Sequence, residues 1–362
     1  MKGRLFPGLV VGYLLLASCG APATGGGASS APTPAAPAAA TAAPQAAASE
    51  PASTSPRALD PARFIVTAIS LSISPAAVAY DLGFFADEGI DADLVYVAGA
   101  ATPAQALVAG EVQFVGGAGA TAVPAGLEGA GLVVIAVHVN TFAFAIMAPG
   151  LERMEQLRDK RVAITRRGAA TDYAARYALP RFGLQPEQDV LIVPLEGNPE
   201  ILAGLETGAA DAGVLSDFGI AETRRRGYHE LLDISSLGVE YSLTGLVTTR
   251  KLVEERPDYV RRFVRAWVRG LAYSLTNPQE VMPLLAKFLR TSDLELTEAG
   301  YREYAPVVQR VPYPRVGGIQ TVLDTLAPTN PRAASADPRD FMDDRFIREL
   351  DDAGYFRQLY GQ

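Results

Sequence analysis

Residues 64–97 read FIVTAISLSISPAAVAYDLGFFADEGIDADLVYV, and this stretch decides the fold. It opens with an apolar, β-rich run over 64–69, which is typical of a buried parallel strand. Ser74–Pro75 then has the form of a helix cap followed by proline at the first helical position. Apolar residues at helical spacing continue to Gly89, and a second strand is predicted over 92–97. This strand–helix–strand order predicts a parallel sheet covered by helices.

The same alternation continues along the chain. Further strands are predicted at 112–115, 132–139, 161–165, 190–195, 211–215 and 243–248. The pair of a capping residue and proline recurs at Thr102–Pro103, Asn198–Pro199, Asn277–Pro278 and Asp337–Pro338, and each pair predicts a helix start. A long helix is predicted over 257–275, with its arginines on a solvated face. The fold class is therefore α/β, and a ligand is expected at the carboxyl ends of the strands.

Composition excludes several functional classes. The 362 residues carry 40 acidic and 32 basic side chains, a formal net charge of -8, which gives no electrostatic footprint for nucleic acid. Cys19 is the single cysteine, so an internal disulfide and a cysteine-ligated zinc site are excluded. The two histidines, His138 and His229, leave little material for metal binding or for a histidine-based triad. No cofactor is expected.

The N-terminus has the form of a secretory signal. Residues 1–18 combine an early basic pair with a short apolar core, and that core is too short to span a bilayer. The sequence Leu16-Ala17-Ser18-Cys19-Gly20 resembles a bacterial lipobox, which predicts lipidation of Cys19 and a membrane anchor on the extracytoplasmic face. The Ala/Pro-rich composition of 19–57 predicts a disordered tether.

Five segments resemble the solute-binding proteins for sulfonates, nitrate and thiamine-pyrimidine precursors. The first helix, 74–90, ends in the family's G-x-F-x-x-x-G-I/L pattern. The other four are the turn at 106–114, the second-lobe start at 157–164 (LRDKRVAI), the step at 205–212 (LETGAADA) and the helix start at 257–263 (PDYVRRF). Together they span about residues 62 to 360, and their order carries the resemblance.

This resemblance implies the type II periplasmic-binding-protein fold, with two α/β lobes, a hinge and an interlobe cleft. Lobe 1 is expected over 62–145 and 246–362, and lobe 2 over 146–245. The implied function is that of a monomeric, lipid-anchored protein that captures a small molecule and delivers it to an ABC permease. The implied protein performs no chemistry on its ligand.

Three loops that follow strands are expected to face the cleft. The loop 70–74 offers Ser72 and Ser74, although Ser74 alternatively only caps its helix. The glycine-rich loop 116–121 offers Gly117, Ala118 and Thr121, where backbone N–H groups at a helix start favour an anion. The loop 166–172 offers Arg167, Gly168 and Thr171, and a guanidinium beside a helix N-terminus suits a sulfonate, carboxylate or phosphate. Alternatively, the arginines of this loop are only charged surface residues and do not contact the ligand.

Five further residues complete the candidate site. Asn198 and Asp217 follow later strands, while Asn140, Phe142 and Tyr241 lie near the expected lobe crossings. An anionic, sulfonate-like ligand and a neutral heterocycle stacked on Phe142 and Tyr241 both remain open.

Two other functions are weighed beside import. A binding module that reports its ligand to a receptor would share the same cleft and anchor. A pyrimidine-synthase-like enzyme would need a pyridoxal-binding lysine, a histidine and a cysteine-rich motif, and the predicted folded part contains no cysteine. No pairing of a nucleophile with a base is evident in the sequence.

Overall fold

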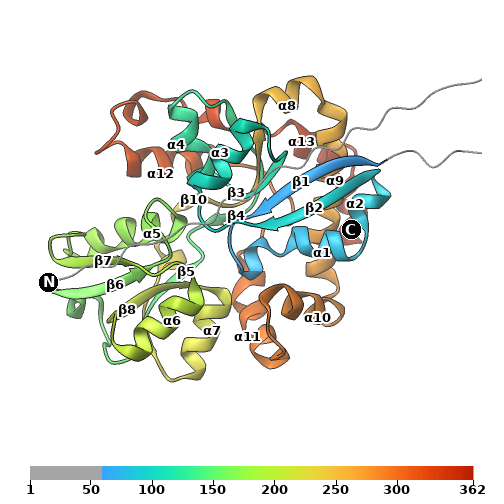
Figure 1. The fold of residues 1–362 in the computed structure, drawn as a ribbon. Helices are drawn as coiled ribbons and strands as arrows, with labels where there is room; N and C mark the ends of the chain where they lie inside the picture. Colours follow the sequence, from blue (N-terminus) through green and yellow to red (C-terminus); the bar gives the residue numbers. More distant parts are fainter. Residues whose placement is uncertain (1–58, 362) are drawn as a thin grey trace, which may run out of the picture. The chain divides into compact units, whose positions relative to one another are not determined.

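The computed structural model describes residues 59–361 (Figure 1). The predicted signal peptide, the lipidation site Cys19 and the tether lie outside these residues. The described chain forms two five-stranded sheets. We call the first sheet with its helices lobe 1 and the second sheet with its helices lobe 2.

The lobe 1 sheet has the strand order β2-β1-β3-β10-β4. Its strands are β1 (Asp60–Val66), β2 (Ile90–Tyr96), β3 (Phe114–Gly117), β4 (Leu132–Thr141) and β10 (Glu240–Thr249). β1 pairs in parallel with β2 and β3, whereas β10 is antiparallel to β3 and β4. The chain thus returns from lobe 2 to fill a central position in this sheet.

The lobe 2 sheet has the order β7-β6-β8-β5-β9. Its strands are β5 (Phe144–Ala148), β6 (Lys160–Ile164), β7 (Val190–Pro194), β8 (Ala212–Ser216) and β9 (His229–Asp233). β6 is parallel to β7 and β8, whereas β5 is antiparallel to β8 and β9. The chain crosses between lobes after β4 and after β9, so the boundaries expected at 145/146 and 245/246 fall inside β5 and β10.

Fourteen α-helices surround the sheets within the described residues. Lobe 2 carries α5 (Ala170–Ala178), α6 (Asn198–Thr207) and α7 (Asp217–Arg225). The lobe 1 helices before the first crossing are α1 (Pro75–Asp81), α2 (Phe84–Asp87), α3 (Ala101–Ala109) and α4 (Gly119–Leu127). After the second crossing come α8 (Arg250–Glu255), α9 (Pro257–Thr276), α10 (Pro278–Leu289), α11 (Leu294–Tyr304), α12 (Val316–Leu326), α13 (Arg345–Asp352) and α14 (Tyr355–Tyr360).

Strand periodicity explains how the lobe 2 sheet holds helices on both faces. On β5, Ile146 packs in one core cluster with α5, whereas its neighbour Met147 packs in another with α6. Successive strand residues point to opposite faces, so a run with no polar residue covers two layers at once. Figure 1 shows α5 on one side of this sheet and α6 and α7 on the other.

The long helix α9 forms the core of lobe 1, as its sequence predicts. Phe263 stacks on Phe114 of β3 with 3.7 Å between ring centroids, and Trp267 is buried one turn further along. The arginines of α9 make ion pairs rather than standing free in solvent. The pairs are Arg261 with Glu349, Arg262 with Asp60, Arg265 with Glu88 and Arg269 with Asp87.

The prediction of parallel sheets is wrong, because each sheet mixes parallel and antiparallel strands. Strands β5 and β9 were also not expected from the sequence. β9 reads His229-Glu230-Leu231-Leu232-Asp233, and its half-exposed edge position requires no apolar run. A strand's direction also depends on where the chain enters the sheet, which local sequence does not encode.

No helix among residues 59–361 is long and apolar enough to cross a membrane. Within the same range, no cluster of three or more histidine, aspartate or glutamate side chains is arranged to hold a metal ion.

Candidate functional site

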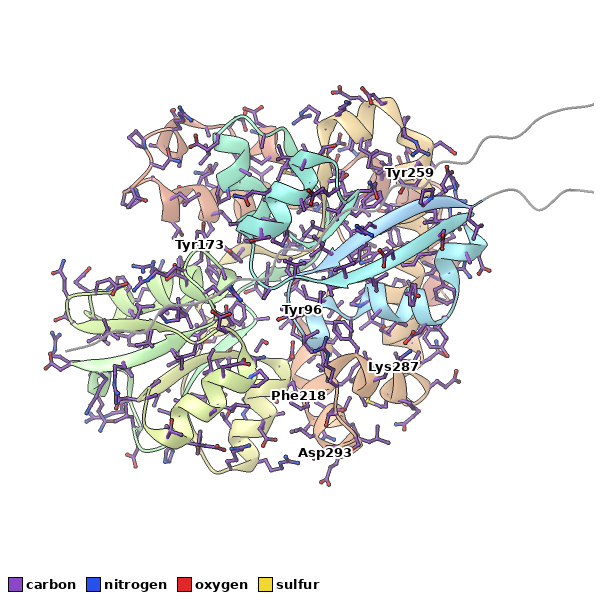
Figure 2. The ribbon with its side chains drawn as sticks, viewed as in Figure 1. Tyr96, Tyr173, Phe218, Tyr259, Lys287 and Asp293 are labelled. Carbon is purple, nitrogen blue, oxygen red and sulfur yellow. The ribbon has the colours of Figure 1, made fainter. Side chains whose placement is uncertain are left out.

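A cavity of about 440 Å³ lies where strands of both lobes end and helices begin. Lobe 1 lines it with the loops after β1, β2 and β3, and lobe 2 with the loops after β6 and β7 and with the last residue of β8. Its volume is in the range of small-molecule sites, which is about 300–1,000 Å³. Figure 2 shows Tyr96, at the end of β2, near the junction of the two lobes.

Four helices open on this cavity with an N-cap residue that has no side-chain oxygen. Their N-cap residues all line it and are Ala100 of α3, Ala118 of α4, Ala169 of α5 and Gly197 of α6. Neither alanine nor glycine has a side-chain oxygen that could accept a first-turn N–H. Elsewhere in the described residues, Thr249 caps α8 and Asp293 caps α11 through their side chains, whereas α9 and α12 also lack a side-chain cap. The four ends named above differ from these because they meet at one cavity. The site therefore presents donor-rich, partly positive helix ends from both lobes.

Hydroxyl groups line the remaining polar wall. Ser70 and Ser72 share a hydrogen bond of 3.0 Å, and Thr165 and Thr171 share one of 2.7 Å. The Asn198 amide donates to the Ser216 hydroxyl at 3.2 Å. These groups hold one another in place, and each hydroxyl retains capacity for a ligand.

The formal charges that line the cavity cancel. Arg166 and Arg290 are balanced by Glu196 and Glu200. Arg166 forms an ion pair with Glu196, yet its Nε is buried without a hydrogen-bond partner among the described residues. Arg290 lies over the Tyr96 ring, 5.7 Å from its centroid. The guanidinium groups are thus positioned by protein contacts before any ligand binds.

Six predicted site residues line the cavity: Ser72, Gly117, Ala118, Thr121, Thr171 and Asn198. Gly117 is the last residue of β3, and the other five follow strand ends, as the topology argument expected. Whether they contact a ligand remains a prediction.

The structure places seven predicted site residues outside this cavity: Ser74, Asn140, Phe142, Arg167, Gly168, Asp217 and Tyr241.

Ser74 and Arg167 were predicted to bind the ligand, but each side chain makes a contact within the protein instead. The Ser74 hydroxyl is fully buried and donates to the Leu71 carbonyl at 2.7 Å, so it neither caps α1 nor reaches the cavity. Arg167 turns to Glu187, whose carboxylate accepts its N–H at 2.5 Å and raises the pKa of Arg167. Gly168 donates its N–H to the Asp172 carboxylate at 2.8 Å.

The hinge residues belong to the core. Phe142 and Tyr241 stack at 3.9 Å between ring centroids, and both are fully buried between the crossing strands. Burial raises the pKa of Tyr241 well above its usual value. The Asn140 amide donates to the backbone oxygens of Val137 and Tyr313. A ligand stacked on Phe142 and Tyr241 is therefore incompatible with this packing.

The structure adds lining residues that the sequence did not single out. Phe144 lines the cavity while also packing in the core, where it is 7% exposed. Arg166 rather than Arg167 faces the site, and a loop has no periodicity that separates the two. Tyr96 and Arg290 come from a strand end and a helix C-terminus in distant parts of the sequence. The backbone of Arg290 is left-handed, with φ 58°, which is unusual for a residue other than glycine. This feature is visible only in the structure.

Asp217 lines a second cavity of about 250 Å³ that shares Ser72, Ala143 and Phe144 with the first. Asp217 is 6% exposed, and its carboxylate accepts N–H groups from Leu71, Ser72 and Phe218. Burial outweighs these bonds and raises the pKa of Asp217.

These lobes and their shared cavity define the two-lobed type II fold of periplasmic binding proteins. The sequence model of the NMT1/THI5-like family matches residues 71–281, more than half of the chain, and the chain belongs to this family.

Three known proteins illustrate the relationship. A binding protein of Brucella abortus strain 2308 is 24% identical over 272 residues, which cover 74% of this chain and 84% of the relative. The riboflavin-binding protein RibY of Chloroflexus aurantiacus is 26% identical over 248 residues, or 66% of this chain and 70% of RibY. The periplasmic aliphatic sulphonate binding protein SsuA of Escherichia coli superposes with a TM-score of 0.64 at 16% identity, covering 78% of this chain and 91% of SsuA. The last comparison shows a shared fold.

Proposed function

We propose that this protein captures a small organic solute in the interlobe cavity and delivers it to an ABC importer without altering it chemically. One observation carries the proposal: uncapped helix N-termini from both lobes open on a single cavity. A solute that bridges these ends would draw the lobes together, which is the hinge-closing mode of capture. The binding proteins related in sequence support this function.

The lining favours a solute with acceptor oxygens on an apolar or aromatic body. Helix N-termini and hydroxyls would bind the oxygens, and side chains such as Ile69, Phe144 and Leu289 would cover the body. Because the charges of the lining residues cancel, the site has no net positive charge for a strong anion. We therefore favour a heterocycle with carbonyl groups over a simple sulfonate. RibY, a relative in sequence, is named a riboflavin-binding protein, and riboflavin is a heterocycle with carbonyl groups.

Attachment to the cell surface completes the proposal. Lipidated Cys19 would hold the protein on the extracytoplasmic face of the membrane, and the tether would let it reach a permease. The two lobes together would present the docking surface only when closed.

The adjacent arginines of the loop after β6 provide the test. The full chain is heated with riboflavin, hydroxymethylpyrimidine, benzenesulfonate, nitrate and amino acids, and the unfolding midpoint is recorded. A solute at 100 times its dissociation constant should stabilise the native state by about 2.7 kcal/mol. Arg166→Ala alters the cavity, whereas the control Arg167→Ala alters a neighbouring ion pair outside it.

We expect at least one heterocycle to raise the midpoint, with binding weakened in Arg166→Ala and retained in Arg167→Ala. A shift by benzenesulfonate alone would support the anionic ligand instead. Equal effects of the two arginine variants would place binding outside this cavity.

A further inference from the structure

One carboxylate of lobe 2 binds the backbone of lobe 1. Asp217 is the first residue of α7, and its Oδ1 and Oδ2 accept the N–H groups of Leu71 and Ser72 at 3.2 and 3.4 Å. These two residues belong to the lobe 1 loop between β1 and α1. The contact joins residues 145 and 146 positions apart in the chain and is buried.

The loop that Asp217 holds is also a wall of the ligand cavity. Ser70, Ser72 and Ile73 line that cavity, and the two serine hydroxyls bond to each other. On its other side, the Ser72 carbonyl lies 2.7 Å from Nε2 of His138, on the lobe 1 strand β4. Ser72 is therefore fixed by lobe 1 through its carbonyl and by lobe 2 through its N–H.

We propose that Asp217 is an interlobe positioning residue that locks lobe 2 onto the cavity loop of lobe 1, so that lobe closure also sets the Ser70–Ser72 hydroxyl pair. The consequence for solute binding rests on the proposed function. The lock itself is a property of the protein without a ligand.

Contacts between α7 and α11 hold the start of α7 against the lobe 1 loop. Gly300 of α11 leaves room for the α7 backbone, because a Cβ there would lie 3.1 Å from Cα of Phe218 and 3.2 Å from Leu71. Two ion pairs flank the contact: Arg224 binds Glu303, and Arg225 binds Asp293 at 2.5 Å. Figure 1 shows α7 (yellow) beside α11 (orange), and Figure 2 labels Phe218 and Asp293 in this region.

The chemistry of the contact makes it sensitive to one atom. A carboxylate offers two acceptor oxygens, which match two backbone donors. In Asp217→Asn, the amide nitrogen would face a backbone N–H, and a buried donor without a partner destabilises the closed arrangement. An open arrangement would expose both groups to water and would not suffer this penalty.

The lock can be tested without any ligand by measuring an interlobe distance. Spin labels are placed at exposed positions of α3 and α6 through Val108→Cys and Thr207→Cys, in the full chain carrying Cys19→Ser. Pulsed electron paramagnetic resonance then measures the distribution of distances between the two spin labels. In the parent protein we expect a short, closed-lobe distance as the main population and a longer, open-lobe distance as a minor one. A solute can enter the open form and shift the balance further toward closure. In Asp217→Asn, the ratio of long to short distances should rise about tenfold or more, the effect of losing a charged hydrogen bond.

Two further variants control for folding. Asp217→Ser keeps one side-chain oxygen, which can still accept the N–H of Phe218. It removes the second acceptor oxygen of the carboxylate, so this variant should also open the lobes. Asp233→Asn alters a carboxylate that accepts an N–H within lobe 2 alone and should leave the distance unchanged. Circular dichroism confirms that each variant is folded. The lock would be overturned if the parent protein lacked a dominant short distance, or if the Asp217 variants kept the parent's ratio of long to short distances. Failure of every solute to bind would leave this result intact and would count only against the proposed function.

Discussion

At the residue scale, His138 shows how burial fixes a protonation state. Its Nε2 lies 2.7 Å from the Ser72 carbonyl, so this nitrogen carries the proton and donates. The ring packs edge-on against Trp267 and Tyr304. Burial lowers the pKa of His138 from 6.5 to about 4, because a charged imidazole would lose its hydration.

This shift predicts acid sensitivity. Between pH 6.5 and 4 the unfolded chain binds a proton at position 138 and the folded chain does not, so the free energy of unfolding falls as the pH falls. The loss attributable to His138 should reach about 3 kcal/mol near pH 4. Urea unfolding at pH 7, 5.5 and 4.5 measures it. His138→Gln should lose this part of the pH dependence, and the exposed His229→Gln variant should keep it; identical profiles for both would refute the assignment.

Arg290 gives a second prediction at this scale. Its guanidinium lines the cavity over Tyr96, and no ion pair forms with it among the described residues. Arg290→Ala should weaken binding of the preferred solute about tenfold, with little change in stability. Arg310 lies similarly over Tyr360, 5.2 Å from the ring centroid, but outside the cavity. Arg310→Ala is therefore the matched control in a calorimetric titration, and an equal loss in both variants would exclude a specific role for Arg290.

Individual side chains mark the limit of prediction from sequence. Strand ends correctly located Thr121, Thr171 and Asn198 at the cavity, because parallel strands end at one edge of a sheet. Phe142 was chosen for the site, but it packs in the core and Phe144 lines the cavity. The chain bends between β4 and β5, and the alternation of faces does not continue across the bend. Arg290 follows a helix rather than a strand, so its place at the cavity could not be predicted from the ends of strands.

At the element scale, the contact between α1 and α9 depends on one glycine. A Cβ at Gly270 of α9 would collide with the Pro75 carbonyl oxygen and lie 2.8 Å from Cβ of Ala79. Gly270→Ala should therefore lower the free energy of unfolding by about 1–3 kcal/mol, the usual effect of overpacking. Denaturant titration measures this loss. Gly150→Ala, at an exposed site with no neighbour within 4 Å, is the control and should change stability little.

The positions of helices and strands were easier to predict from the sequence than the directions of the strands in the sheets. Helix starts at Pro75, Pro257 and Pro278 agree with the sequence pattern, since proline there loses no helical hydrogen bond. The antiparallel course of β10 was not predictable, because it follows from the chain's return from lobe 2. Strand β5 was missed because it follows the β4 run after only a short break.

At the scale of the whole molecule, the anchor can be tested separately from the fold. Cys19 lies outside the described residues, and its lipidation is predicted from the residues around it. In a bacterial host, the full chain should incorporate labelled palmitate and sediment with membranes. Cys19→Ser should abolish both while leaving solute binding unchanged. Membrane association that persists in this variant would point to a different anchor.

Solute capture between the lobes is the central claim, and calorimetric titration of the full chain tests it most directly. The titrant is each solute of the panel in turn, and the comparison variant is Asn198→Trp, which places a large ring at a half-exposed cavity position. We predict one-to-one binding of at least one solute to the parent protein and its loss in the variant. No binding of any solute to the parent, or equal binding by the folded variant, would contradict the claim.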